Sequence, residues 1–294
     1  MGISAEPGTE RRARVVAISG SSGLVGSALT RSLEASGHSV RHLGRGAAAA
    51  TGLDGADVVV NLAGENIAQR WSASAKRRIR ESRVVTTTSI AEAMASMPHG
   101  PRVLVSGSAI GIYGSRGDEL LDEASTLGDD FLASVCRDWE AATEPALGAG
   151  ARVVHLRTGI VLSPHGGALA KMLPAFRLGA GGRMGSGRQW MSWISLPDMV
   201  RAIEFVIEHA DANGAVNIVA PGPVTNAEFT TVLARVLHRP AVVPVPKFAL
   251  SLMFGEMADG TVLASQRVTP TRLERLGMEF EHPVLESALR AVLD

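Results

Sequence analysis

The 294-residue sequence predicts an α/β fold built on a doubly wound parallel sheet, followed by a smaller C-terminal region. Strand patterns alternate with helical patterns of about 10 to 20 residues, which is typical of parallel βαβ units. An apolar run, Val15–Ile18, leads into a glycine loop, Gly20–Gly26, and this loop opens a helical pattern. Glycine is abundant, with 32 residues, whereas aromatic residues make up only 4% of the chain. This balance suits tight turns between strands and helices.

The expected elements of the sheet region follow the loop in regular order. Strands are predicted at 13–19, 39–43, 57–63, 102–108 and 152–157, and helices at 25–36, 72–97 and 130–147. Only 11 residues, Gly46–Ala56, separate the second strand from the third. A crossover helix plus an edge strand needs clearly more chain than this. We therefore expect the third, outer strand of the usual fold to be stunted or missing.

The composition and spacing of the predicted elements change after about residue 163. Glycine-rich loops at 166–167, 179–182 and 185–187 separate short helices, and such loops often carry function. A helix is expected at 196–209 and a strand at 216–219, and Thr225–Glu228 has the spacing of a capping box that opens another helix. From Lys247 onward we expect three short helices, with Pro270 and Pro283 near two of their starts.

These patterns divide the chain into three parts. We expect a disordered tail at 1–13, a dinucleotide-binding domain at 14–163 and a substrate-facing region at 164–294 that interleaves with the sheet and ends in the three helices.

Charge and cysteine content exclude several classes of function. The 29 basic and 29 acidic residues balance to a formal net charge of zero, so nucleic acid is not an expected partner. The one cysteine, Cys136, leaves no internal disulfide and no multi-cysteine zinc site. No stretch approaches the roughly 18 apolar residues of a membrane helix. We expect a cytoplasmic protein without a membrane partner, and a homodimer stays open.

The glycine loop has the spacing GxxGxxG between a strand and a helix, which is the context of a Rossmann dinucleotide fingerprint. Gly20 allows the tight turn, Gly23 lets the backbone approach a pyrophosphate at the positive helix end, and Gly26 lets helix and strand pack closely. A tight turn without a ligand is the alternative. The cofactor-binding residues expected here are Gly20, Ser22, Gly23, Leu24, Val25 and Gly26.

The end of the second strand indicates which dinucleotide is bound. An acidic residue there would bind a ribose diol, but the sequence offers Arg41, His42, Gly44 and Arg45, which suit a 2′-phosphate. NADP is therefore favoured over NAD, with Arg45 as the expected phosphate ligand. A solvated loop charge is the alternative for Arg45.

Further motifs together resemble the extended short-chain dehydrogenase/reductase superfamily. They are Asn61–Gly64, Ser106–Ser108 with Tyr113-Gly114, and Trp193-Ile194 with Asp198. More narrowly, the sequence resembles the atypical, NAD(P)-dependent epimerase/dehydratase-like branch called epimerase-family protein, in Asn61–Asn66, Arg70-Trp71, Gly166–Leu169, Gly185–Trp190, Gly255–Ala258 and Gln266–Val268. The resemblance covers about residues 14–293. It implies that Leu62, Ala63 and Gly64 line the adenosine side of the cofactor and that Ser106 also contacts it.

The proton-transfer pair of that superfamily is missing. Its usual mechanism needs a tyrosine and a lysine four residues later. The one tyrosine, Tyr113, is followed four places on by Gly117, and aligning the later helix puts Leu132 and Cys136 at the two places. Ser108 is the surviving catalytic candidate, as a hydrogen-bond donor to a substrate oxygen. We interpret Cys136 as a small packing residue, with a reactive thiol as the alternative.

The expected substrate is a small anionic or sugar-like molecule, bound between the segments Ser106–Tyr113 and Gly181–Trp193. The candidate contacts are Glu65, Asn66, Tyr113, Arg157, Arg188 and Trp193. Helix capping is the alternative for Glu65 and Asn66, and packing is the alternative for Tyr113. The basic cluster 76–83 is interpreted as a solvated helix face. No metal site is expected.

The predicted function follows from these candidates. It is NADP-dependent oxidoreductase or epimerase chemistry by hydride transfer, and the alternative is a non-catalytic NADP-binding regulatory or scaffold protein.

Overall fold

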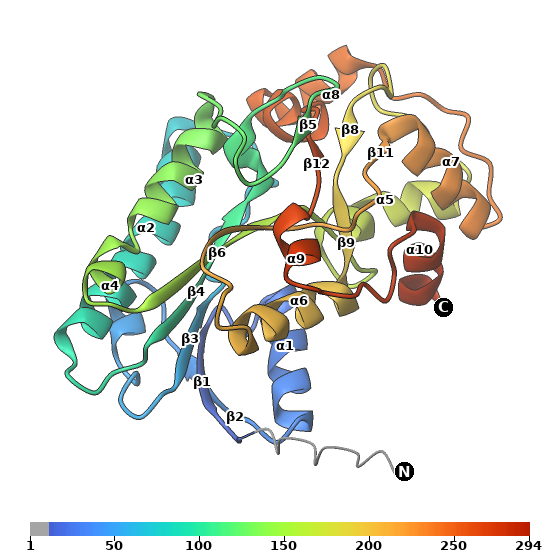
Figure 1. Ribbon diagram of the computed structural model, residues 1–294. Coiled ribbons are helices and arrows are strands. Elements are labelled where there is room, and N and C mark those ends of the chain that lie inside the picture. Colours follow the sequence, from blue (N-terminus) through green and yellow to red (C-terminus); the bar gives the residue numbers. More distant parts are fainter. Residues whose placement is uncertain (1–11) are drawn as a thin grey trace, which may run out of the picture.

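The computed structural model describes residues 12–294 (Figure 1). The disordered tail expected at 1–13 therefore lies almost wholly outside the described residues. Within the described range, no helix is both long and apolar enough to cross a membrane.

The centre of the molecule is a six-stranded sheet with the order β10-β6-β4-β3-β1-β2. Every neighbouring pair of strands in this sheet is parallel. The strands are β1 (Val15–Ser19), β2 (Ser39–Leu43), β3 (Val58–Asn61), β4 (Val103–Ala109), β6 (Arg152–Thr158) and β10 (Gly214–Ile218). The predicted fold class, a doubly wound parallel sheet, is confirmed.

The outer strand of the usual doubly wound order is missing. The chain leaves β2, forms only the short 3₁₀ helix η1 (Gly46–Ala50), and returns to β3 on the other side of β1. In the usual order a further strand lies outside β2. Here β2 is the edge of the described sheet, as the shortness of the connection predicted.

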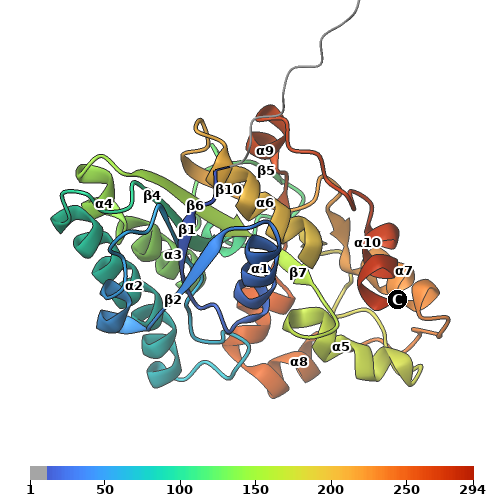
Figure 2. The ribbon, with the colours of Figure 1, turned by 90° about the horizontal axis from the view of Figure 1, so that it is seen from below.

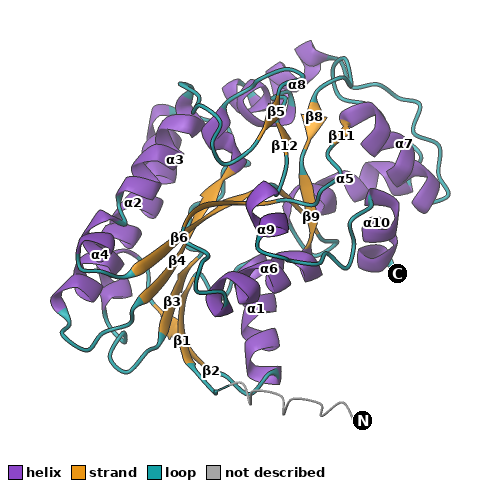
Figure 3. Cartoon of the chain, in the orientation of Figure 1, coloured by secondary structure: helices purple, strands orange, loops and turns teal. Residues whose placement is uncertain are grey.

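Two layers of helices cover the sheet (Figures 2 and 3). α1 (Leu24–Ala35) and α6 (Leu196–Glu208) cover one face, and α2 (Ala73–Ser96), α3 (Phe131–Ala141) and α4 (Glu144–Gly148) cover the other. Successive residues of a strand point to opposite faces. In β1, Val16 and Ile18 therefore pack in the core beneath α1 and α6, whereas Ala17 packs in the core beneath α2. Buried hydrophobic side chains therefore pack on both faces of the sheet, which holds the strands in place.

The helix predicted at 130–147 is wrong as a single element. The structure forms two helices, α3 and α4, with Pro145 in the first turn of the second. Proline has no N–H to donate to the carbonyl of Ala141, four residues earlier, and its ring clashes with that carbonyl. The break turns the chain before it enters β6.

The second region forms a core of its own beside the sheet. Its elements are β7 (Ile160–Leu162), α5 (Gly167–Arg177), β8 (Trp190–Met191), β9 (Trp193–Ser195), β11 (Val224–Thr225), α7 (Asn226–Val236), α8 (Lys247–Phe254), the π-helical turn η3 (Ala258–Val262), β12 (Arg267–Val268), α9 (Thr271–Arg275) and α10 (Leu285–Leu293). The capping box at Thr225 and Glu228 is present, with both reciprocal bonds. The three predicted C-terminal helices are α8, α9 and α10.

The two regions interleave, because β10 pairs with β6 in the central sheet and β12 pairs with β5 (Leu120–Leu121). The exact division at residue 163 stays a prediction.

Candidate functional site

The glycine loop between β1 and α1 is shaped by very close backbone contacts. Gly20 has a φ of +81°, and a Cβ there would lie 2.7 Å from the carbonyl carbon of Leu62. A Cβ on Gly26 would lie 2.2 Å from the Gly20 carbonyl oxygen. A Cβ on Gly23 would meet that same oxygen at 3.2 Å and otherwise open space. Gly20 and Gly26 thus serve packing, whereas Gly23 keeps an open approach to the backbone.

The amino end of α1 lies at this open approach. Gly23 is its N-cap, and no side chain in the described part of the chain caps it. The first N–H groups of a helix carry partial positive charge and lack partners inside the helix. Ser22 is exposed, Leu24 and Val25 are half-buried, and Gly26 is buried. The residues present therefore fit a dinucleotide pyrophosphate, and the individual contacts stay predictions.

The segment after β3 lies against the loop. Leu62 donates its N–H to the Ser19 carbonyl at 2.9 Å, and Ala63 donates to Asn61 Oδ1 at 3.3 Å. From the second region, Gly166 approaches Leu24, because a Cβ there would lie 3.4 Å from Leu24 Cδ1. The loop before α5 therefore lies beside the amino end of α1.

The two arginines near the end of β2 have different surroundings. The Arg41 guanidinium donates to the carbonyl of Gly52 at 2.8 Å and to that of Asp54, so it is held against the crossover. Arg45 is exposed at the N-cap of η1. Arg45 is thus the more accessible of the two cations, and its binding of a 2′-phosphate stays a prediction.

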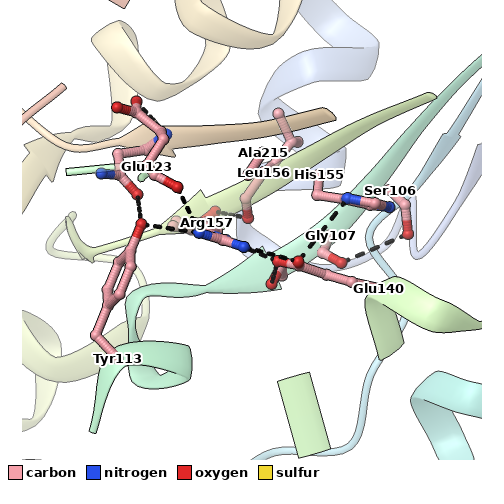
Figure 4. Close-up of polar contacts among 12 residues, drawn as sticks. Ser106, Gly107, Tyr113, Glu123, Glu140, His155, Leu156, Arg157 and Ala215 are labelled. Carbon is pink, nitrogen blue, oxygen red and sulfur yellow. Dashed lines mark hydrogen bonds and ion pairs between the residues drawn. The ribbon is translucent and has the colours of Figure 1, made fainter. Parts of the chain in front are cut away.

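Arg157, Glu140 and Tyr113 form a buried polar network (Figure 4). Ser108, which is buried near the end of β4, belongs to this network. Its hydroxyl donates to Glu140 Oε1 at 2.7 Å. Arg157 donates to the same carboxylate twice, from Nε and Nη2, at 2.9 Å each. Arg157 also donates from Nη1 to the Tyr113 hydroxyl at 3.1 Å, and Tyr113 donates to Asn217 Oδ1 at 2.7 Å. The network therefore ties β4, α3, β6 and β10 together.

The charges of this network balance internally. Burial would raise the pKa of Glu140, but the hydrogen bonds and charge of Arg157, with smaller contributions from His155 and Ser108, hold that pKa below its ordinary value. Burial would lower the pKa of Arg157, but Glu140 raises it. Burial raises the pKa of Tyr113 and lowers the pKa of His155. The network thus holds one carboxylate and one guanidinium as a neutral pair.

Burial bears on three of the expected substrate contacts, whose roles stay predictions. Arg157 is paired with Glu140. The side chains of Tyr113 and Trp193 are 0% exposed in this structure. Trp193 donates its indole N–H to the Gly222 carbonyl at 2.8 Å.

The other predicted residues, apart from the buried Ser106, lie nearer the surface. Arg188 is exposed in the loop before β8, and its backbone N–H donates to Ser186 Oγ. Asn66 Oδ1 accepts from the Ala68 N–H at 2.9 Å, and Glu65 Oε1 accepts from Gln69 Nε2 at 3.3 Å. Neither residue caps a helix, because the next helix, α2, has Ser72 as its N-cap, so the helix-capping alternative for Glu65 and Asn66 is wrong and these bonds are local loop contacts. Ser106 is fully buried, with its hydroxyl 3.5 Å from the Gly107 carbonyl oxygen.

Cys136 is buried, and burial first, then Glu140, raises the pKa of its thiol to about 12. A thiol with so high a pKa is a poor nucleophile near pH 7. The packing interpretation fits this environment better than the reactive one.

Sequence reasoning missed two residues, Glu140 and Arg83. Glu140 stands one helical turn after Cys136, so the i, i+4 spacing of a helix places both on one face. Arg83 was grouped with a solvated basic face, which is wrong for this residue, because its guanidinium lies against Gly64 and Trp139. The residues Ile79, Thr87 and Ile90 of the same helix are buried, and Arg83 lies at helical spacing from Ile79 and Thr87. This spacing could have placed Arg83 on the buried face.

The sheet, the glycine loop and the interleaved second region define an extended Rossmann protein of the short-chain dehydrogenase/reductase type, with a nucleotide-cofactor site. The chain belongs to the NAD dependent epimerase/dehydratase family, whose sequence model matches residues 16–219. Residues 245–292 match a domain of unknown function, DUF1731. The resemblance read from the sequence is confirmed, and the chain is an NAD(P)-binding protein of that family.

Named relatives extend this likeness over nearly the whole chain. The "Epimerase family protein Mb2239" of Mycobacterium bovis is 47% identical over 291 residues, covering 94% of this chain and 96% of the relative. The crystal structure of human epimerase family protein SDR39U1 with NADPH has a TM-score of 0.90 at 35% identity, covering 95% of this chain and 98% of that one. A nucleoside-diphosphate sugar epimerase from Corynebacterium glutamicum has a TM-score of 0.79 at 40% identity, covering 96% of this chain and 58% of that one.

Proposed function

We propose that the protein binds NADP(H) in preference to NAD(H) and uses it in hydride transfer with a small, sugar-like substrate. The observation that carries the proposal is the open glycine loop at the amino end of α1, with Arg45 exposed at the end of the neighbouring β2. The similarity to a human protein crystallised with NADPH supports the cofactor choice.

Each part of the loop region has a task in this proposal. The N–H groups at the start of α1 bind the pyrophosphate, and Arg45 binds the 2′-phosphate. Leu62 and Ala63 form the wall on the adenosine side. Bound at this place, the dinucleotide would supply or accept the hydride, and the protein's residues orient the substrate toward it.

The part of the site around Ser108, where the substrate is proposed to bind, is polar, and its buried charges, Glu140 and Arg157, are paired with each other. The Ser108 hydrogen is donated to Glu140, so Ser108 Oγ presents lone pairs and accepts a hydrogen bond from a substrate hydroxyl. Glu140 itself is a weak base, because Arg157 holds its pKa low after opposing the effect of burial. Ser108 therefore positions an alcohol group. Since Arg157 is neutralised, a hydroxylated, sugar-like molecule suits the site better than an anion.

Thermal unfolding with each cofactor tests the preference. NADP should raise the melting temperature more than NAD at equal concentration, because a ligand at about 100 times its Kd stabilises by roughly 2.7 kcal/mol and a weaker ligand by less. Arg45→Asp should shrink the difference between the two cofactors, and Arg31→Asp on the exposed side of α1 is a control that should not. Equal shifts from NADP and NAD in the parent protein would remove the argument.

A non-catalytic NADP-binding module is the second candidate. Leu132 and Cys136 stand where the superfamily has its proton-transfer pair, and the Ser108 hydrogen is bound within the protein. Absorbance of the reduced cofactor separates the two candidates when NADPH is incubated with carbonyl metabolites and NADP with hydroxylated metabolites. A binding module gains stability with either cofactor and converts neither, whereas the enzyme oxidises NADPH with at least one carbonyl compound or reduces NADP with at least one hydroxylated compound.

A further inference from the structure

Arg83 on α2 lies at the carboxyl end of β3. A Cβ added to Gly64 would be 2.9 Å from Arg83 Cζ and 3.0 Å from its Nη2. The guanidinium also lies over the Trp139 ring, 5.0 Å from the ring centroid, and Nη1 donates to the Ile79 carbonyl at 2.9 Å. The guanidinium thus occupies the space between the end of β3 and α3.

Within residues 12–294, the Arg83 guanidinium has hydrogen-bonding and ring contacts but no ion pair with a carboxylate. Burial lowers the pKa of Arg83, with Cys136 and Glu65 opposing the shift. A guanidinium has five N–H donors, and the Ile79 carbonyl and the Trp139 ring engage only part of that capacity. Lys76 and Arg80, on the same helix, form ion pairs with Glu256 and Asp138. Arg83 has no such carboxylate partner among the described side chains.

The strand order places this cation relative to a bound dinucleotide. The pyrophosphate position is at β1, and Arg45, at the end of β2, lies on one side of it. β3 and β4 lie on the other side, and a dinucleotide spans the crevice at the carboxyl ends of the strands. Trp139, on which Arg83 stacks, packs against Gly107 of β4. Arg83 therefore starts from Gly64, where the segment expected to line the adenosine side ends, and reaches toward Trp139 and β4, which is the direction in which the nicotinamide half would lie.

We propose that Arg83 binds the nicotinamide half of the dinucleotide, through the ribose hydroxyls and the adjoining phosphate. Arg83, on α2, would thus supply the positive charge of the superfamily's lysine, whose place on α3 is taken by Cys136. This inference rests on the proposed NADP(H) binding. The stack on the Trp139 ring restrains the planar guanidinium, and the N–H groups that the Ile79 carbonyl does not engage are the ones that we assign to the dinucleotide.

The test compares the affinities of two ligands, NADPH and adenosine 2′,5′-bisphosphate, by titration calorimetry. The second ligand carries the adenosine half alone. Arg83→Gln should weaken NADPH binding roughly ten- to a hundredfold, since hydrogen bonds to charged groups are lost, and leave the bisphosphate within about twofold. Arg45→Gln should weaken both ligands. Arg77→Gln, at an exposed position on the same helix, should weaken neither.

The outcomes separate this inference from the proposed function. A parent protein that binds neither ligand overturns both. A parent that binds NADPH, with unchanged affinity in Arg83→Gln, overturns only the role of Arg83, as does an equal loss for both ligands. If Arg83→Gln does not fold, Arg83→Lys keeps the charge but not the planar fork, and the same selective loss is then expected at a smaller size.

Discussion

Removal of one partner from the buried Glu140–Arg157 pair should strongly destabilise the protein. In Glu140→Gln, the Arg157 side chain, only 7% exposed, keeps its charge and loses the carboxylate that accepts two of its hydrogen bonds. Breaking such a pair typically costs about 3–5 kcal/mol of unfolding free energy. At roughly 2 °C per kcal/mol for a chain of this size, the melting temperature should fall by about 6–10 °C.

The matched control replaces both charges. In Glu140→Leu with Arg157→Met, apolar side chains of similar size fill the same space, and such replacements of buried pairs are often neutral. The double variant should therefore recover at least half of the stability lost in Glu140→Gln. Urea unfolding of the parent and both variants measures this. A Glu140→Gln variant within about 1 kcal/mol of the parent would refute the reasoning.

The same pair predicts how stability depends on pH. Burial opposes ionisation of Glu140, but Arg157 brings its folded-state pKa below the ordinary value of 4.5. A depressed folded pKa contributes stability that is complete above the unfolded pKa and is lost as the pH falls through the folded pKa. The parent should lose this contribution below about pH 4.5, and the double variant should show a flatter decline there. Melting curves from about pH 7 to about pH 3.5 test the difference.

Two further substitutions test the loop and the interior of the site. Gly20→Ala should lower both stability and NADPH affinity, because φ is +81° and a Cβ would strike the Leu62 backbone. Gly37→Ala is the control in the same melting and titration assays, because Gly37 has a φ of +82° beyond the other end of α1 with open space around it, so NADPH affinity should not change. Cys136 should resist a thiol reagent in the folded protein and react on unfolding, since it is buried with a pKa of about 12, and Cys136→Ser should leave NADPH affinity unchanged. Rapid labelling of the native thiol, or loss of NADPH binding in Cys136→Ser, would support the reactive alternative.

The sequence contained most of the information about the sheet. Buried parallel strands are short apolar runs bounded by glycine or polar residues, so β1 to β4, β6 and β10 were found within a few residues. The missing outer strand followed from chain length alone, since 11 residues do not suffice for it. The single helix expected at 130–147 failed because the pattern stayed apolar through Pro145, where the backbone cannot continue.

The buried side of the site was harder to predict, because its partners are distant in sequence. Arg157 and Tyr113 were predicted as substrate contacts, but in the structure they bond to Glu140 and Asn217, which lie on other elements. No local spacing indicates that an arginine on β6 meets a glutamate on α3. Residues of the glycine loop were easier to assign, because the strand, the turn and the helix that shape the loop are contiguous.

The distribution of arginines then indicates what the site is built to bind. Arg157, at the end of β6, is neutralised by Glu140, and Arg41 is held by backbone carbonyls of the crossover. Arg45 and Arg83 remain, and the strand order places them on opposite sides of the amino end of α1. A dinucleotide with three phosphates matches cations spread along the crevice, whereas a small anionic substrate would need them beside Ser108. The available positive charge therefore favours the cofactor, and the substrate end is left with neutral hydrogen-bonding groups suited to hydroxyls.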